Sequence, residues 1–223
     1  MLTLASGSPR RRQLLDALGA HYVSAAADVD ERAATHPALA KAEHVARPGT
    51  VTLAADTMIE LGRERIGKPA DARQATEMLR ALAGRTHIVR TEVALIGAAG
   101  RRFWFAVRSG VTMRPRDDGV IAAYVATGEP LDKAGSYALQ GQGAALVESY
   151  AGCYSNIVGL PLCHVFSALR KMGVAVSERP ERAFEGTFGF RCPAAALGRS
   201  QGRSLRHGVE YDSADGDRST GLR

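Results

Sequence analysis

The stretch Val51-Thr52-Leu53-Ala54-Ala55-Asp56-Thr57 decides how the fold of this chain is interpreted. Residues 51–55 form a short apolar run that starts with two β-branched residues, and such a run is typical of a buried strand. The run ends on Asp56, and a carboxylate beside a buried strand is unfavourable unless it meets water, a partner or a metal ion. A solvated loop acid is the simpler alternative, and this stretch alone favours neither.

The residues that follow predict a hairpin whose far end carries a base. Residues 58–66 turn on Gly62 and lead into Gly67-Lys68-Pro69, where the lysine lies between a flexible and a rigid residue. An acid and a base are therefore expected at the two ends of one hairpin. The alternative for Lys68 is an ordinary surface lysine.

Length and composition indicate one globular domain. The chain has 223 residues, of which 45% are hydrophobic, which is enough for one sizeable core and too few for two ordinary domains. No apolar run reaches membrane-spanning length, and the N-terminus lacks the order of a signal peptide, so we expect no membrane partner. The three cysteines have no metal-binding spacing, which predicts reduced thiols in a cytoplasmic protein.

The charge of the chain fits a phosphate-bearing ligand better than a nucleic acid. The formal net charge is +6, but lysine and arginine are spread along the whole sequence. Aromatic residues, which stack on bases, make up only 6% of the chain. We therefore expect no nucleic-acid partner.

The N-terminal residues predict an anion-binding site. Residues 3–6 are a short strand, Ser8 is a good N-cap, and Pro9 suits the first position of the helix that follows. Free backbone N–H groups and the positive end of the helix dipole would face a ligand there, joined by the forked donors of Arg10 and Arg11. Three arginines in a first turn oppose the dipole, which favours a bound anion over a capped surface helix.

The rest of the pattern predicts an α/β protein. Strands are expected at 21–25, 86–96, 103–113 and 144–150, and helices at 37–46, 72–83, 119–126 and, last, 162–172. The glycine-rich residues 129–143 predict a loop that faces a ligand, whereas the acidic residues 28–31 alone predict a solvated loop. Periodicity is lost after residue 176, so we expect a domain over 1–176 and a disordered tail over 177–223.

Five motifs, in the order of the family, resemble the Maf-like proteins, which are nucleoside triphosphate pyrophosphatases also called septum formation inhibitors. They are Leu4-Ala5-Ser6-Gly7-Ser8-Pro9-Arg10-Arg11, Ala55-Asp56-Thr57, Gly67-Lys68-Pro69, Glu129-Pro130 through Gly141, and Ser155-Asn156 through Leu162. The resemblance implies a long twisted mixed sheet flanked by helices, with two lobes and a central cleft. It also implies hydrolysis of nucleoside triphosphates to the monophosphate and pyrophosphate, a divalent cation (Mg²⁺ or Mn²⁺), nucleotide-pool cleaning and, commonly, a homodimer.

The resemblance also assigns roles to residues. Asp56 matches the presumed catalytic base and metal-site acid, and Glu31 matches the second acid of the metal site. Four residues match the phosphate-binding positions: Ser8, Arg11, Lys41 and Lys68. These residue types suit the chemistry, because hard cations prefer oxygen ligands and phosphoryl transfer needs neutralised charge and an in-line water.

Three positions favour the branch that acts on dTTP and UTP. They are Arg10, Thr57 and Gln140, where the 7-methyl-GTP branch typically carries Trp, Gln and Glu. A glutamine can pair with the N–H and carbonyl edge of uracil or thymine, whereas a glutamate would favour a cationic methylguanine.

The segment between Glu31 and Lys41 is shorter than is usual in this family. Ten residue steps still span roughly 33 Å when extended, so the shortening affects orientation rather than reach. The shortening leaves open a catalytically impaired nucleotide-binding regulator of cell division. A 7-methyl-GTP pyrophosphatase, from the other branch of the family, is a separate alternative. The retention of Asp56, Thr57 and Gln140 favours catalysis.

Overall fold

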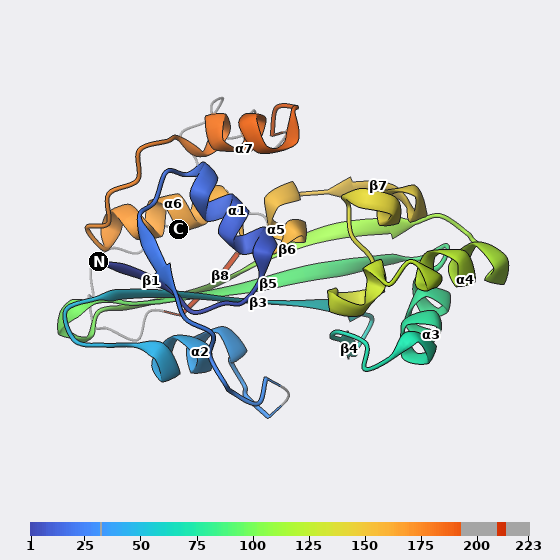
Figure 1. Cartoon of the computed structure of the whole chain (residues 1–223), viewed down its shortest axis with the longest axis horizontal. Helices are drawn as coiled ribbons and strands as arrows, with labels where there is room; N and C mark the ends of the chain where they lie inside the picture. The colour runs from blue at the N-terminus through green and yellow to red at the C-terminus, as the bar shows by residue number, and fades with distance from the viewer. Residues whose placement is uncertain (32, 193–208, 213–223) are drawn as a thin grey trace, which may run out of the picture.

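The computed structural model describes residues 1–31, 33–192 and 209–212. One long mixed sheet runs through the molecule, with helices on both of its faces (Figure 1). Its strands in the described part of the chain are β1 (Leu2–Leu4), β2 (Tyr22–Ser24), β3 (Val51–Leu61), β4 (Glu64–Ile66), β5 (Thr86–Ile96), β6 (Arg102–Met113), β7 (Val147–Ala151) and β8 (Val209–Asp212). The α/β class and the mixed, helix-flanked sheet predicted from the sequence are confirmed.

The sheet combines parallel and antiparallel pairs in the order β2-β1-β3-β5-β6-β7, with β4 beside β3 and β8 beside β6. The short strand β1 is parallel to both β2 and β3, whereas β3, β5, β6 and β7 form a series of antiparallel pairs. The predicted hairpin of the two longest β-rich segments is thus β5–β6, and the predicted turn at Gly62 joins β3 to β4.

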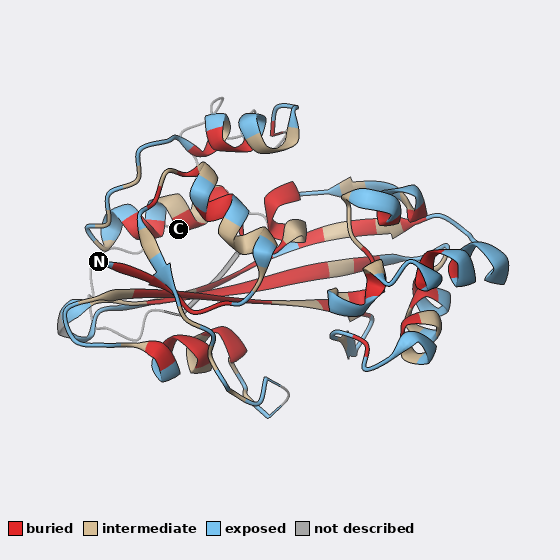
Figure 2. Cartoon of the chain, in the orientation of Figure 1, coloured by how far each residue is buried: buried red, intermediate tan, exposed pale blue. Residues whose placement is uncertain are grey.

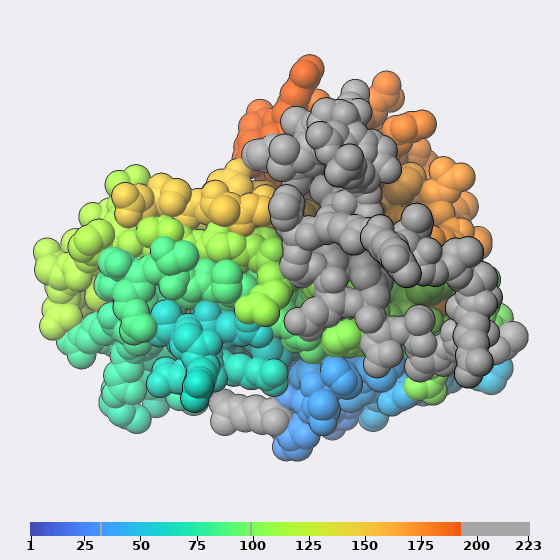
Figure 3. All heavy atoms as spheres, turned by 180° about the vertical axis from the view of Figure 1, so that it is seen from behind, coloured from blue at the N-terminus to red at the C-terminus, as the bar shows by residue number. Residues whose placement is uncertain are grey.

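The helices fall into three groups. One face of the sheet is covered by α1 (Pro9–Ala17), α5 (Tyr154–Val158), α6 (Leu162–Lys171) and α7 (Pro180–Phe188), and the opposite face by α2 (Pro37–Val45). At the other end of the sheet lie α3 (Ala72–Leu82) and α4 (Asp118–Ala126), with the short 3₁₀ turns between residues 129 and 146 (Figures 1 and 3). None of the described helices is long and apolar enough to cross a membrane.

Buried residues lie along the strands and the inward sides of the helices (Figure 2). Leu53 and Ala55 of β3 pack in a cluster with α1, α5 and α6, whereas Ile59 of the same strand packs in a second cluster with α3 and α4. Two cores therefore lie at the two ends of continuous strands, which gives the molecule two lobes.

The prediction that the first buried strand ends before Asp56 is wrong. β3 continues to Leu61, because β5 pairs with it in unbroken register from Thr52 to Glu60. Asp56 is consequently a mid-strand residue with fixed backbone geometry. The hairpin still separates Asp56 from Lys68, as predicted.

The prediction of a disordered tail is wrong for the segment up to residue 192. There α7 begins at Pro180 and packs Phe184, which is 1% exposed, against Tyr154, with 5.8 Å between the ring centroids. Because Phe184 joins the same core as α1 and α6, ordered structure continues past residue 176, and α6 is not the last helix. Apart from β8, the remainder of the predicted tail lies outside the described residues.

Candidate active site

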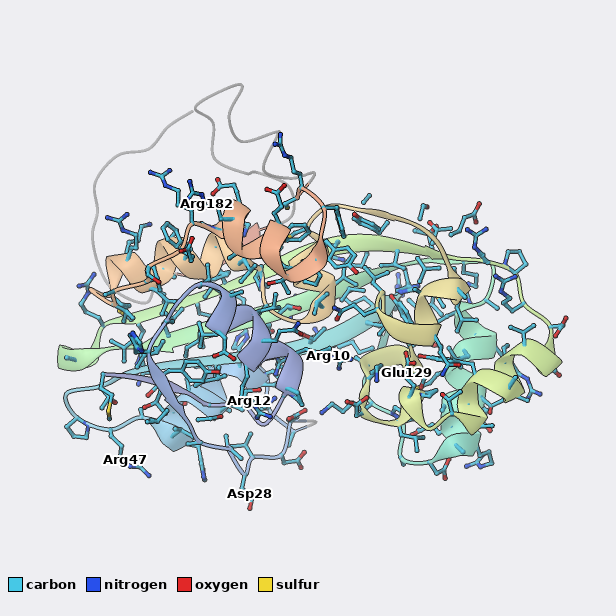
Figure 4. The ribbon with its side chains drawn as sticks, turned by 45° about the horizontal axis from the view of Figure 1, so that its top comes forward. Arg10, Arg12, Asp28, Arg47, Glu129 and Arg182 are labelled. Carbon is cyan, nitrogen blue, oxygen red and sulfur yellow. The ribbon has the colours of Figure 1, made fainter. Side chains whose placement is uncertain are left out.

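A gap in the sheet positions the candidate site. On one edge of β3, β1 pairs with residues 51–53 and β4 with residues 59–61. Between them, residues 54–58 have a partner only on the other edge, in β5, among the described strands. A cavity of about 1130 Å³ lies at this gap, between the two lobes. Arg10 at the start of α1 and Glu129 of the other lobe lie on opposite sides of it (Figure 4).

All of the site residues predicted from the sequence line this one cavity. They are Ser8, Arg10, Arg11, Glu31, Lys41, Asp56, Thr57, Lys68 and Gln140. They come from segments as far apart as residues 8 and 140, so their convergence is a property of the fold and not of sequence proximity.

Lys41 joins the two predicted acids. Its Nζ lies 2.7 Å from Oδ1 of Asp56 and 2.7 Å from Oε1 of Glu31. Lys41 is 7% exposed and Asp56 8% exposed, so each depends on the other for charge compensation. The shortened segment before Lys41 therefore still brings these three groups together, because α2 starts at Pro37 and places Lys41 one turn later against β3.

A third acid, which the sequence analysis missed, lies beside Asp56. Glu92 of β5 is the cross-strand partner of Asp56, and directly opposed residues project from the same face of a sheet. Glu92 is 2% exposed, and its Oε1 lies 2.5 Å from Nη1 of Arg90. The alternation of charges at positions 90 and 92, inside a predicted strand, was the signal that could have identified this pair.

The N-terminus of α1 forms the next side of the cavity. Ser8 caps the helix by accepting a 3.5 Å hydrogen bond from the backbone N–H of Arg11, and Pro9 takes the first helical position, so the predicted helix start is confirmed. A helix start of this kind presents free N–H groups to an anion.

Arg11 is turned into the protein rather than toward solvent. It donates from Nε to the Gly159 carbonyl (3.0 Å), from Nη1 to Ser6 Oγ (3.3 Å) and from Nη2 to Thr57 Oγ1 (3.0 Å). Burial lowers the pKa of Arg11, and the nearby carboxylates of Asp56 and Glu31 oppose this effect. Three of its N–H groups are thus used within the protein, so Arg11 orients Thr57 as well as contributing positive charge to the cavity.

Behind Thr57 lies a polar network that the sequence analysis also missed. Thr57 Oγ1 lies 2.9 Å from Thr91 Oγ1. Thr91 Oγ1 in turn donates a 2.9 Å hydrogen bond to the backbone carbonyl of Asn156, called the Asn156 carbonyl below. The side-chain amide of Asn156 donates to the Val89 carbonyl (3.1 Å) and to Ser109 Oγ (3.0 Å). The motif that contains Asn156 therefore supports the cavity from behind.

Glu129 holds the loop that carries Gln140. Its carboxylate accepts hydrogen bonds from the backbone N–H groups of Gln142 (3.0 Å) and Gly143 (3.2 Å) and from the hydroxyl of Tyr124 (3.1 Å). Gly143 is needed for this packing, because a Cβ there would lie 2.5 Å from the Tyr124 hydroxyl. The predicted ligand-facing loop is thus a fixed structure that presents Gln140 to the cavity.

Lys68 extends from the loop after β4. It is exposed, and within the described residues it forms no ion pair at 4.0 Å or less. Its ammonium group can therefore meet an anionic ligand without first breaking an internal contact.

The acids of the cavity fit one mode of binding a divalent cation. No group of three or more His, Cys, Asp or Glu residues able to hold a metal ion occurs in the described part of the chain. Asp56 and Glu31 nevertheless line the same cavity, and each contacts the ammonium group of Lys41. Mg²⁺ is commonly held by one or two carboxylates together with water and substrate phosphates, and this pair is sufficient for that mode.

Fold and site together define an α/β protein whose two lobes enclose a cleft lined by acidic and basic side chains. Acidic groups that can hold a cation lie on one side of it, and a helix N-terminus with arginines lies on another.

The chain belongs to the Maf-like family. The family model described as "Maf-like protein" matches residues 1–172. Among similar proteins, one from Myxococcus xanthus is 43% identical over 192 residues, covering 80% of this chain and 96% of its own length. Another, from Anaeromyxobacter dehalogenans, is 46% identical over 190 residues, covering 80% of this chain and 98% of its own. A third, from Thermomicrobium roseum, is 44% identical over 207 residues, with 87% and 94% covered. All three are named dTTP/UTP pyrophosphatase.

Proposed function

We propose that this protein hydrolyses dTTP and UTP to the nucleoside monophosphate and pyrophosphate. The observation that carries the proposal is the position of Asp56, which lies in mid-strand at the gap of the sheet and pairs with Lys41 at 2.7 Å. This acid–base pair shares one cavity with the α1 N-terminus and with Gln140. The names of the relatives support the substrate class.

In the reaction a water oxygen bonds to the α-phosphorus, and the bond from that phosphorus to the bridging oxygen of pyrophosphate breaks. Asp56 orients the water and takes its proton as the new bond forms. Lys41 holds the Asp56 carboxylate in place. Because negative charge accumulates on the departing pyrophosphate, Lys68 and the N-terminus of α1 stabilise it there, and Arg11 adds positive charge to the same cavity.

Asp56 and Glu31 are the residues that would hold a divalent cation. When bound, such a cation polarises phosphate oxygens and lowers the pKa of a bound water. The chemistry of the two side chains supports this assignment, since both are carboxylates that line the same cavity and oxygen ligands are those that such a cation prefers.

Specificity is assigned to Arg10, Thr57 and Gln140, which line the same cavity. The alternative of a nucleotide-binding regulator without turnover is not favoured. It required the shortened segment to misplace Glu31 or Lys41, but the two side chains lie 2.7 Å apart. The 7-methyl-GTP alternative is not favoured either, because similar proteins carry the dTTP/UTP name. A homodimer and a cytoplasmic location stay predictions.

Pyrophosphate release from UTP, dTTP, CTP, GTP and 7-methyl-GTP, with Mg²⁺ or Mn²⁺, tests the proposal. The wild type should act on UTP and dTTP, and Asp56→Asn should abolish turnover while leaving the circular dichroism spectrum unchanged. Asp28→Asn is the matched control, because Asp28 is exposed and lies outside the cavity (Figure 4). Turnover by Asp56→Asn at a near-normal rate would refute the role of Asp56, and a wild type inactive on every substrate would refute the function.

A further inference from the structure

Two threonines of the central sheet lie in contact below the cavity. Thr57 of β3 and Thr91 of β5 are cross-strand partners, and their hydroxyl oxygens lie 2.9 Å apart. Thr57 lines the cavity, whereas Thr91 is 0% exposed and cannot touch a ligand. Any effect of Thr91 on a substrate must therefore pass through Thr57.

The contacts of Thr91 determine the direction of both hydroxyl hydrogens. The Asn156 carbonyl, 2.9 Å from Thr91 Oγ1, can only accept, so the single hydroxyl hydrogen of Thr91 is donated to it. Thr91 Oγ1 then accepts the hydrogen of Thr57. The opposite assignment would leave two acceptor oxygens facing each other at hydrogen-bond distance in a buried site, which is unfavourable.

Arg11 completes the assignment at Thr57. A guanidinium group can only donate, and Nη2 of Arg11 lies 3.0 Å from Thr57 Oγ1. A hydroxyl group has one hydrogen and two lone pairs. The hydrogen of Thr57 points to Thr91 and one lone pair meets Arg11, so only a lone pair is left for the cavity.

The Asn156 carbonyl is itself held in place. It accepts a second hydrogen bond, at 3.0 Å, from the backbone N–H of Gly159. The Asn156 side chain is 0% exposed and is anchored to Val89 and Ser109. The relay from Asn156 to Thr57 is therefore rigid at each step.

A fixed hydrogen-bond acceptor can distinguish uracil and thymine from cytosine, whereas Gln140 alone cannot. Uracil and thymine carry a hydrogen on N3, whereas N3 of cytosine is an acceptor. A glutamine amide can turn over and present either its oxygen or its nitrogen, so it can pair with both kinds of base. Among the residues that the structure describes, none hydrogen-bonds to the side-chain amide of Gln140 and prevents such a turn.

We propose that Thr91 is a positioning residue that locks the hydroxyl group of Thr57 as an acceptor, and that this lock selects N3–H bases over cytosine. The inference rests on the proposed function, because it places the base of the nucleotide at Thr57. In this arrangement the polarity of the contact to the base is set by Thr91, one residue below the binding surface, and not by Gln140.

The test compares kcat/KM for UTP and CTP in four forms of the full-length protein: wild type, Thr91→Val, Thr91→Ser and Thr86→Val. Thr91→Val keeps the shape but removes the hydroxyl, and the Asn156 carbonyl retains its bond from Gly159. Thr86→Val is the matched control, since Thr86 and Thr112 form a second cross-strand threonine pair, also at 2.9 Å, away from the cavity.

The ratio of kcat/KM for UTP to that for CTP should fall about tenfold or more in Thr91→Val, the effect of one matched hydrogen bond. It should stay at the wild-type value in Thr91→Ser and in Thr86→Val. A uniform loss on both substrates in Thr91→Val, a fall of the ratio in Thr91→Ser, or a wild type without preference would overturn the inference.

Binding of UTP and CTP with a non-hydrolysable α,β-methylene bridge separates this inference from the proposed function. If the wild type hydrolyses nothing but binds the UTP analogue in preference, and Thr91→Val loses that preference, the inference stands and the proposed function fails. If the wild type hydrolyses UTP but binds both analogues equally, the proposed function stands and the inference about Thr91 fails.

Discussion

Asp56 and Glu92 oppose each other across the β3–β5 ladder, so the central acid of the cleft has a second, more deeply buried acid as its neighbour. Two carboxylates on one face of a sheet repel each other unless cations compensate for them. Lys41 compensates for Asp56, and Arg90 compensates for Glu92.

Removal of Arg90 alone should therefore reduce stability more than removal of the charges of both Arg90 and Glu92. Arg90→Met leaves Glu92 buried without its guanidinium partner and should lower the free energy of unfolding by about 3 to 5 kcal/mol. Arg90→Met combined with Glu92→Gln should recover most of that loss. Urea unfolding of both variants and of Glu92→Gln measures this, and a double variant no more stable than Arg90→Met would contradict it.

Lys41→Met should lower kcat about 100-fold or more, because Asp56 loses the group that holds it and the cavity loses a positive charge. Lys41→Arg keeps the charge and should retain part of the activity. Lys171→Met, at an exposed position away from the cavity, serves as the control in the pyrophosphate-release assay. Equal activity in Lys41→Met and in this control would exclude the role of Lys41.

Glu129→Gln should loosen the loop that carries Gln140. The carboxylate accepts two backbone N–H bonds, and an amide replaces one acceptor oxygen with a donor, so at least one N–H group loses its partner. We expect a raised KM for UTP with a smaller change in kcat, together with a lower Tm. Glu148→Gln, at an exposed position, should change none of KM, kcat and Tm.

Acid should destabilise the protein through His87. Burial lowers the pKa of His87 from 6.5 to about 4, and its Nε2 lies 2.6 Å from the Tyr137 hydroxyl. The unfolded chain therefore takes up the proton first, and stability falls as the pH drops below 6.5, by about 2 kcal/mol between pH 7 and pH 5.

In the variant His87→Gln, the side chain at position 87 cannot be protonated. The loss of unfolding free energy between pH 7 and pH 5 should therefore be about 2 kcal/mol smaller than in the wild type. His21→Gln, at an exposed position, should keep the wild-type slope. The same slope in His87→Gln and in the wild type would show that His87 is not buried as a neutral group.

The helix α7 should be an integral part of the fold. Phe184→Ala removes a fully buried ring and should cost about 3 to 5 kcal/mol of unfolding free energy. Phe190→Ala, at a position that is 39% exposed, should cost much less. Guanidinium unfolding measures both, and equal stabilities would place α7 outside the cooperative core.

One part of the site could be predicted from local pattern. The capped start of α1 follows from Ser8 and Pro9, which act over one helical turn, so it needs no knowledge of the sheet. The local pattern around Asp56 and Lys68 left a solvated acid and a surface lysine open, and the resemblance to the Maf-like family was needed to identify them among the residues that the structure gathers in one cavity.

The contacts across strands were not predictable in the same way. Glu92 meets Asp56, and Thr91 meets Thr57, only because β5 pairs with β3 in one particular register, and a shift of one residue would move these side chains to the opposite face. Likewise, the ring of Phe184 is buried by helices far away in sequence, and its polar surroundings in sequence hide this.

The gap beside β3 also has a mechanical consequence. The two lobes on either side of the cleft are joined by β3, β5 and β6, which run unbroken past it. A single-residue hinge is therefore absent from the described strands between the lobes. Any change in the width of the cleft has to be a twist that β3, β5 and β6 share, spread over many residues.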